Sequence, residues 1–162
     1  MTIESYKKAC NSGMARACLN LGLLYSDTNK PTDAINWFAQ ACNGGEVNGC
    51  DLKQITEASE LNKENRIAEA AAIMEKFCNE GRSDGCLDLG KLKLEMGDRL
   101  TANKAFLKSC HAGFNGSCAL YGQQEMQQGR LEVASEFCGK ACKGGSKDGC
   151  DCETAAKAKL SH

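Results

Sequence analysis

The sequence predicts an all-α protein, an α-solenoid of antiparallel helix pairs that disulfides hold together. A motif with two cysteines recurs five times at a nearly fixed period, and such self-similarity is typical of repeat architectures. The segments between the motifs carry apolar residues at helical spacing. The chain also has one proline in 162 residues and few β-branched residues, which disfavours a sheet protein.

In each motif seven residues separate the two cysteines, and a glycine stands three positions after the first. The copies are CNSGMARAC from Cys10, CNGGEVNGC from Cys42, CNEGRSDGC from Cys78, CHAGFNGSC from Cys110 and CKGGSKDGC from Cys142. Glycine suits the left-handed position that ends a helix, so each motif is expected to join two helices. The copies begin 32, 36, 32 and 32 residues apart, which predicts one array over residues 1–162 with five cysteine-linked repeats.

The helices follow in order from the apolar pattern and from the residues that end each segment. The segment AINWFAQAC places apolar side chains on one helical face. Pro31 favours a helix start, Gly97 and Gly129 favour helix ends, and Asp98 suits an N-cap. The predicted helices are 2–11, 14–27, 32–43, 47–60, 64–79, 83–96, 99–111, 115–128, 131–143 and 147–160. The 36-residue repeat is expected to carry its four extra residues in the polar segment 57–65.

A second glycine recurs inside the helices that follow the motifs. Gly22, Gly90 and Gly122 share one register in CLNLGLLY, CLDLGKLKL and CALYGQQ. Because glycine inside a helix costs about 1 kcal/mol relative to alanine, its recurrence predicts a close approach between helices.

The cysteine motif is interpreted as a disulfide across the helix–helix turn, because a turn of this length can bring two Cα atoms within about 4.4–6.8 Å. A zinc site is the alternative, but its ligands usually stand two to four residues apart and the chain has two histidines. No C-x-x-C redox motif occurs. We therefore expect no metal and no cofactor. The expected pairs are Cys10–Cys18, Cys42–Cys50, Cys78–Cys86, Cys110–Cys118 and Cys142–Cys150.

Two further cysteines, Cys138 and Cys152, flank the last motif. Cys138 holds a position that an aromatic residue or methionine occupies in the other repeats. A sixth disulfide between the two is favoured, and the alternative is a pair of buried free thiols.

The composition limits the class of partner and the compartment. Twenty basic and twenty-one acidic residues nearly cancel, which disfavours nucleic-acid binding. No apolar run approaches the roughly 18 residues that membrane insertion needs. Disulfides imply an oxidising compartment, periplasmic or extracellular. The segment MTIESYKKAC has no signal-peptide core, so we expect a signal to have been removed ahead of it.

Residues that could carry chemistry are sparse. A serine β-lactamase needs S-x-x-K together with S-D-N and K-T-G elements. Only Ser5-Tyr6-Lys7-Lys8 matches the first element, and the other two are absent. We therefore predict no catalytic residue. Trp37 is expected to pack in the core rather than to anchor a ligand.

The best candidates for binding lie two, five and nine positions after the second cysteine, on one helical face. Its polar members are the candidate partner-binding residues; the alternative is that they are only solvated. A protein or peptide segment is the expected partner. The candidates are Asn20, Asp27, Asp88, Lys91, Glu95, Gln123 and Gln127.

Nearly the whole chain resembles the Sel-one-like repeats, which are related to the tetratricopeptide repeat. The resemblance rests on LGLLY, AINWFAQAC and the cysteine links, and the links are similar to those of the Helicobacter cysteine-rich proteins. The chain departs from that group in its 32-residue period, where 36 is usual, and in repeats that lack Leu-Gly. The resemblance implies a right-handed α-solenoid whose first helix in each repeat lines a concave, partner-binding groove.

The resemblance also suggests what the protein does. Most relatives are scaffolds or adaptors, so we expect a non-catalytic protein that binds a protein or peptide. One alternative is a periplasmic immunity protein against a secreted toxin such as a phospholipase. Another is penicillin binding or weak β-lactamase activity.

Overall fold

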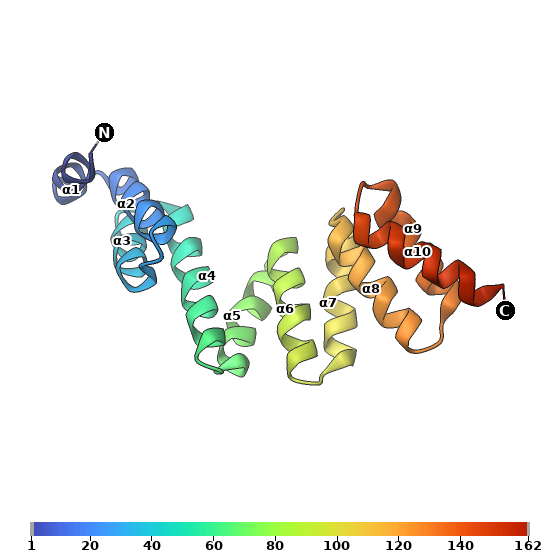
Figure 1. The fold of residues 1–162 in the computed structure, drawn as a ribbon. Coiled ribbons are helices and arrows are strands. Elements are labelled where there is room, and N and C mark those ends of the chain that lie inside the picture. The colour runs from blue at the N-terminus through green and yellow to red at the C-terminus, as the bar shows by residue number, and fades with distance from the viewer. Residues whose placement is uncertain (1, 162) are drawn as a thin grey trace. The chain divides into compact units, whose positions relative to one another are not determined.

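The computed structural model describes residues 2–161, and within them it has ten α-helices and no β-strand. The predicted all-α fold is therefore confirmed, and Figure 1 follows the helices along the chain. The helices are α1 (Ile3–Asn11), α2 (Ala15–Asp27), α3 (Pro31–Asn43), α4 (Val47–Lys63), α5 (Ile67–Asn79), α6 (Ser83–Glu95), α7 (Arg99–His111), α8 (Asn115–Gln127), α9 (Leu131–Lys143) and α10 (Lys147–Leu160).

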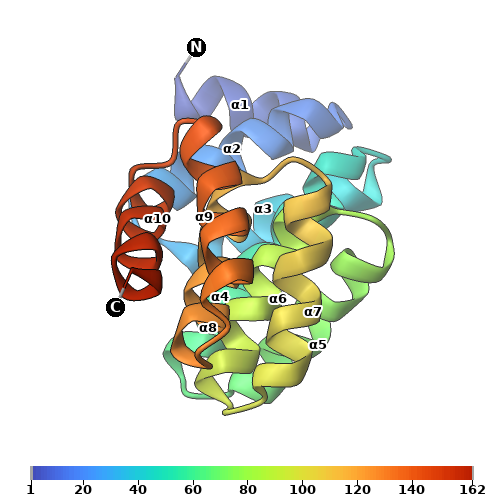
Figure 2. The ribbon, with the colours of Figure 1, turned by 90° about the vertical axis from the view of Figure 1, so that its right-hand side faces the viewer.

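The chain separates into two compact units, Met1–Ile73 and Met74–His162, with the boundary inside α5. In the N-terminal unit α2 packs against α1 and α3, and α3 packs against α4. In the C-terminal unit α6, α7, α8, α9 and α10 pack in chain order, and α8 also packs against α10. Figure 2 shows α7, α8 and α9 beside one another. In a solenoid, each helix packs mainly against the helices next to it in sequence. That one array runs over residues 1–162 stays a prediction.

The motif glycines end the helices as predicted. Gly13, Gly45, Gly81, Gly113 and Gly145 all have φ between 87° and 97°, a region that side chains other than glycine rarely adopt. In the second motif the Gly45 amide donates to the Cys42 carbonyl oxygen at 3.0 Å, and the Glu46 amide donates to the Ala41 carbonyl oxygen at 2.9 Å. These bonds satisfy carbonyl groups that the end of α3 would otherwise leave unpaired.

The irregular repeat differs from its prediction. The predicted end of helix 47–60 and the predicted start of helix 64–79 are wrong, because α4 continues to Lys63 and α5 begins at Ile67. α4 has 17 residues where α2, α6 and α8 have 13, so the four extra residues add about one helical turn rather than a loop. An ion pair of 2.6 Å between Lys63 and Glu60 supports the added turn, which ends before Asn65 at φ 61°.

The recurring helix glycines lie where two helices approach closely, as predicted. A methyl group at Gly22 would overlap the ring of Phe38, and one at Gly90 would overlap the ring of Phe106. Both rings are almost fully buried. The Phe ring therefore occupies the space that the missing side chain leaves.

Trp37 packs at the edge of the N-terminal core, as predicted. Its ring stacks on Tyr25 with centroids 6.3 Å apart, and both residues contact the cluster that contains Leu21 and Phe38. Trp37 therefore contributes to packing of α2 against α3.

Disulfides staple the helices together and use all twelve cysteines. Each of the five motif disulfides joins the end of one helix to the start of the next, with Cα atoms 4.4–4.9 Å apart. A sixth disulfide links α9 to α10, with Cα atoms 5.6 Å apart. The pairs are Cys10–Cys18, Cys42–Cys50, Cys78–Cys86, Cys110–Cys118, Cys142–Cys150 and Cys138–Cys152.

Candidate functional site

The helices that contain the second cysteine of each motif include α8 and α10, which pack side by side in the C-terminal unit. Between them lies a groove of about 380 Å³. Residues 123–127 of α8 form one side of the groove, and residues 148–155 of α10 form the other. The lining residues are Gln123, Met126, Gln127, Asp148, Asp151, Cys152 and Ala155.

The floor of the groove is formed by buried and half-buried side chains, and its rim by exposed polar ones. Cys152 is 5% exposed, and Met126 and Ala155 are half-buried. Cys152 is bonded to Cys138, so it contributes disulfide sulfur to the groove and no thiol. Gln127, Asp148 and Asp151 are exposed. Such a groove can contact an aliphatic chain along its floor and polar groups at its rim.

Two predicted binding residues, Gln123 and Gln127, lie together in this groove. The sequence pattern missed the α10 side, because it covered this face only on α2, α4, α6 and α8. Continuing the same register onto α10 reaches Cys152 and Ala155, which both line the groove. Asp148 and Asp151 lie outside that register, and only the packing of α10 beside α8 brings them to the rim.

A network of polar side chains around the buried Glu125 fixes the position of α8, the helix that carries Gln123 and Gln127. Glu125 is 3% exposed and pairs with Arg130, whose Nη2 donates to Glu125 Oε1 at 2.7 Å. The Asn103 amide donates to the same oxygen from α7 at 3.4 Å. The hydrogen bond with Glu125 raises the pKa of Arg130, and burial followed by the Glu125 charge raises the pKa of Tyr121. This network ties the C-terminal half of α8 to α7 and to the following turn.

The predicted residues of α6 lie elsewhere. Asp88 Oδ1 lies 3.6 Å from Lys91 Nζ in an i,i+3 ion pair, so each charge is partly satisfied within α6. Glu95 is exposed at the end of the helix. None of the three lines the α8–α10 groove.

In the N-terminal unit, Asn20 lines a second groove of about 320 Å³ between α1 and α2. Asp27, the other predicted residue of α2, is exposed at the end of that helix. The walls of this groove are mainly apolar. They are Tyr6, Ala9, Met14, Ala15, Arg16 and Ala17.

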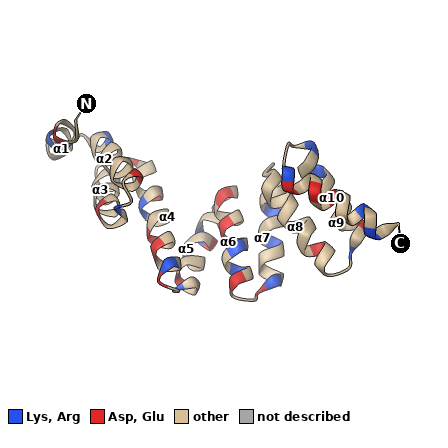
Figure 3. Cartoon of the chain, in the orientation of Figure 1, with Lys and Arg blue, Asp and Glu red and all other residues tan. Residues whose placement is uncertain are grey.

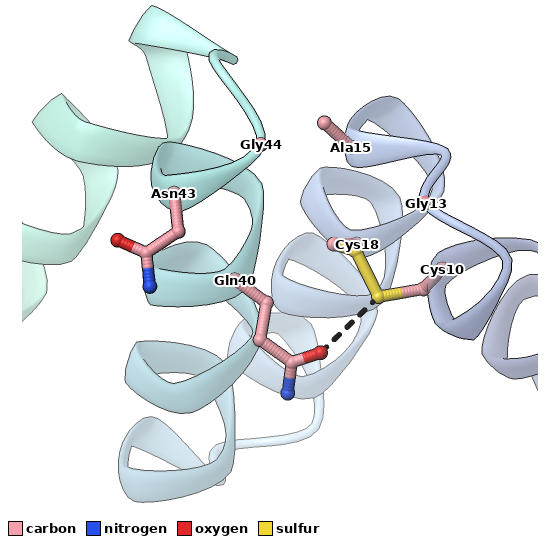
Figure 4. A pocket seen from close by; sticks show the side chains of 7 residues that line it. All are labelled: Cys10, Gly13, Ala15, Cys18, Gln40, Asn43 and Gly44. Atoms are coloured by element: carbon pink, nitrogen blue, oxygen red, sulfur yellow. Dashed lines mark hydrogen bonds between the residues drawn. A yellow bond between two sulfur atoms is a disulfide. The ribbon is translucent and has the colours of Figure 1, made fainter.

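A third hollow, of about 310 Å³, lies beside the first disulfide, between the start of α2 and the end of α3. Figure 4 shows Gln40 extending from α3 toward the Cys10–Cys18 bond, with Oε1 3.4 Å from Cys10 Sγ. A disulfide sulfur has no proton to donate, so this polar contact is weak. The other lining residues are small or polar: Gly13, Ala15, Asn43 and Gly44.

The S-x-x-K serine lies away from these sites, in the first turn of α1. Ser5 is exposed, and its Oγ lies 2.8 Å from Thr2 Oγ1. Within residues 2–161, histidine, cysteine, aspartate and glutamate side chains nowhere gather in threes as a metal site would require. Over the same residues, no helix has both the length and the apolar content needed to cross a membrane.

Comparison with known proteins identifies the fold. Residues 15–43, which comprise α2, the turn and α3, match the tetratricopeptide repeat family. The matched repeat therefore begins with the helix that contains the second cysteine of a motif, so the motif disulfides connect successive repeats. No curated protein matches the chain.

Several solved structures have the same fold at low sequence identity. The structure of MamA aligns with a TM-score of 0.64 and 21% sequence identity. The alignment covers 88% of this chain and 85% of the MamA chain. A Sel1 repeat protein from Oxalobacter formigenes matches 91% of this chain and 65% of its own, with TM-score 0.66 and 20% identity.

A third structure is c5321, a protective antigen of uropathogenic Escherichia coli strains that displays the SLR fold. It matches 91% of this chain and 34% of its own, with TM-score 0.69 and 21% identity. Repeat solenoids of this type are typically modules for protein–protein interaction. The chain is therefore an α-solenoid repeat protein with the Sel1-like fold, as its sequence resemblance indicated.

Proposed function

We propose that this protein is non-catalytic and binds a protein or peptide partner through the faces of the helices that begin each repeat. The observation that carries the proposal is the α8–α10 groove, where Gln123 and Gln127 of the predicted face border a partly apolar floor. Carboxamide side chains donate and accept hydrogen bonds, so they suit the main chain of an extended peptide.

The compartment proposed for this function is the periplasm or the cell exterior. All twelve cysteines are paired, which is consistent with an oxidising compartment. The motif disulfides close short loops, each worth roughly 2.5 kcal/mol in the loop-entropy model. Folding in such a compartment therefore stabilises the helix–helix joints on which the binding faces rest.

The test is capture of a partner from the native extracytoplasmic fraction. Wild-type protein should retain a specific partner, and Gln123→Ala/Gln127→Ala should lose it. Asn36→Ala/Asn79→Ala is a matched control, because it removes two exposed amides from α3 and α5, outside the groove. Equal retention by all three proteins would show that the groove does not bind the partner, and a wild-type protein that retains nothing would contradict the function.

A β-lactam assay tests the non-catalytic part of the proposal. We expect no turnover of a chromogenic cephalosporin above the rate of the heat-denatured protein. Turnover that Ser5→Ala abolishes would overturn it.

A further inference from the structure

The rim of the α8–α10 groove carries two carboxylates that the rest of the protein leaves unpaired. Asp148 and Asp151 stand three positions apart on α10, so both lie toward one face of the helix. Neither makes an ion pair or a side-chain hydrogen bond within residues 2–161. Glu153 on the same helix instead pairs with Lys157. Charges of both signs occur along the helices of this unit (Figure 3).

The other residues of the groove do not neutralise these carboxylates. The α8 side contributes two amides and Met126, and no lysine or arginine lines the groove. Lys147 stands one helical turn before Asp151, but within residues 2–161 it makes no ion pair with either carboxylate. The groove is therefore negatively charged, and the two like charges repel each other by a few tenths of a kcal/mol.

The floor of the groove suits the stem of a long basic side chain. Met126, Ala155 and the Cys138–Cys152 disulfide offer weakly polar contact surface beside the carboxylates. Lysine and arginine lay their methylene groups along such a surface and keep the charged end at the polar edge. An acidic side chain or a phosphate would instead be repelled by Asp148 and Asp151.

From this arrangement we propose that the α8–α10 groove binds an extended peptide segment through a lysine or arginine side chain. The basic group pairs with Asp148 and Asp151, its stem lies along Met126 and Ala155, and Gln123 and Gln127 bind the adjacent peptide main chain. This proposal rests on the partner-binding function proposed above and adds the chemistry of the segment that is bound.

The probe is a phage-displayed library of short random peptides, selected on the wild-type protein at low ionic strength. The expected result is enrichment of a lysine or arginine at one position. A selected peptide should bind Asp148→Asn/Asp151→Asn about tenfold more weakly, which corresponds to the loss of about 1.4 kcal/mol. Its affinity for the wild type should fall as salt is added, because added ions screen the attraction.

The control variant is Asp33→Asn/Glu132→Gln, which removes two exposed acids from the first turns of α3 and α9. It should bind the selected peptide like the wild type. Thermal melts of each variant establish that it folds, and Asp148→Asn alone provides a second variant with a smaller loss. Basic enrichment that persists on the double asparagine variant would overturn the proposal, as would a selection without any basic preference.

The two proposals fail differently. Selected peptides that lack a basic residue, but bind Gln123→Ala/Gln127→Ala weakly, would refute the charge pairing and leave the binding groove intact. A wild-type protein that selects no peptide and captures no native partner would refute both.

Discussion

The Lys108 side chain in α7 donates a hydrogen bond from Nζ to the carbonyl oxygen of Cys78, 30 residues earlier, over 2.7 Å. In the N-terminal unit Gln40 holds the same position in its motif and contacts Cys10, also 30 residues earlier. Both residues stand two positions before a first cysteine. A cysteine of one motif disulfide is thus contacted by the helix that ends near the first cysteine of the next motif.

Removing the Lys108 amine should weaken this contact. We expect Lys108→Met to lower the free energy of unfolding by about 1 kcal/mol, because the methylene stem is kept and one hydrogen bond to a charged group is lost. Urea denaturation followed by circular dichroism measures the change. Lys140→Met, at the matching position of α9, is the control; an equal loss in both variants would contradict the role of the Cys78 contact.

Close helix approach makes Gly90 intolerant of a side chain. Gly90→Ala should lower the free energy of unfolding by about 1–3 kcal/mol, because the added methyl group overlaps the buried ring of Phe106. Gly116→Ala adds the same methyl group to α8 where no atom lies within 4 Å, and should be neutral or stabilising by up to about 1 kcal/mol. Denaturant unfolding compares the two, and an equal loss in both would contradict the packing argument.

The buried carboxylate of Glu125 depends on the planar guanidinium of Arg130. Arg130 contacts both carboxylate oxygens through Nε and Nη2, a geometry that lysine cannot reproduce. Arg130→Lys should lower the free energy of unfolding by about 1–3 kcal/mol. Arg99→Lys, which changes an exposed residue at the start of α7, should have little effect. If Arg130→Lys were as stable as the wild type, the paired geometry would not contribute.

The N-cap of α7 predicts a pH dependence. Hydrogen bonds from Thr101 lower the pKa of Asp98, so the ionised carboxylate is favoured in the folded state. Its contribution is present above the ordinary aspartate pKa of about 3.9 and is lost as pH falls through the lower folded value. Asp98→Ala should therefore be less stable than the wild type at neutral pH, with a difference that closes in acid. NMR titration of the Asp98 carboxyl group checks the direction, and a midpoint above 3.9 would contradict it.

The oxidised state can be tested by mass. Denatured protein treated with iodoacetamide without reductant should keep its mass, and prior reduction should allow twelve additions, one for each cysteine. Uptake of ten or more alkyl groups without reductant would refute the disulfide fold.

Much of the fold could be predicted because each local signal was repeated. The motif glycines identify every helix end that they follow, and Gly22 and Gly90 indicate the sites of close packing. Residues 60–66 gave no such signal, since lysine, glutamate and asparagine there are compatible with either a helix or a turn. The end of α4 is set at Asn65, whose positive φ the sequence does not reveal.

The candidate site was only half predictable, for a related reason. Gln123 and Gln127 follow from the register on α8, because residues on one helical face can be counted from the cysteine. The α10 side depends on how α10 packs beside α8, which is a tertiary relationship. The one available signal was the same register continued onto α10, where Cys152 and Ala155 replace polar residues.

The short disulfides also limit how far the chain can be stretched. Each joins residues eight positions apart in sequence and holds their Cα atoms within 4.9 Å. Eight extended residues would span about 26–29 Å, so each bond withholds roughly 20 Å of contour from a pulling force. When the two ends of the chain are pulled apart, the oxidised molecule therefore reaches its full extension at a shorter end-to-end distance than the reduced one. Its inter-repeat turns stay closed under this force.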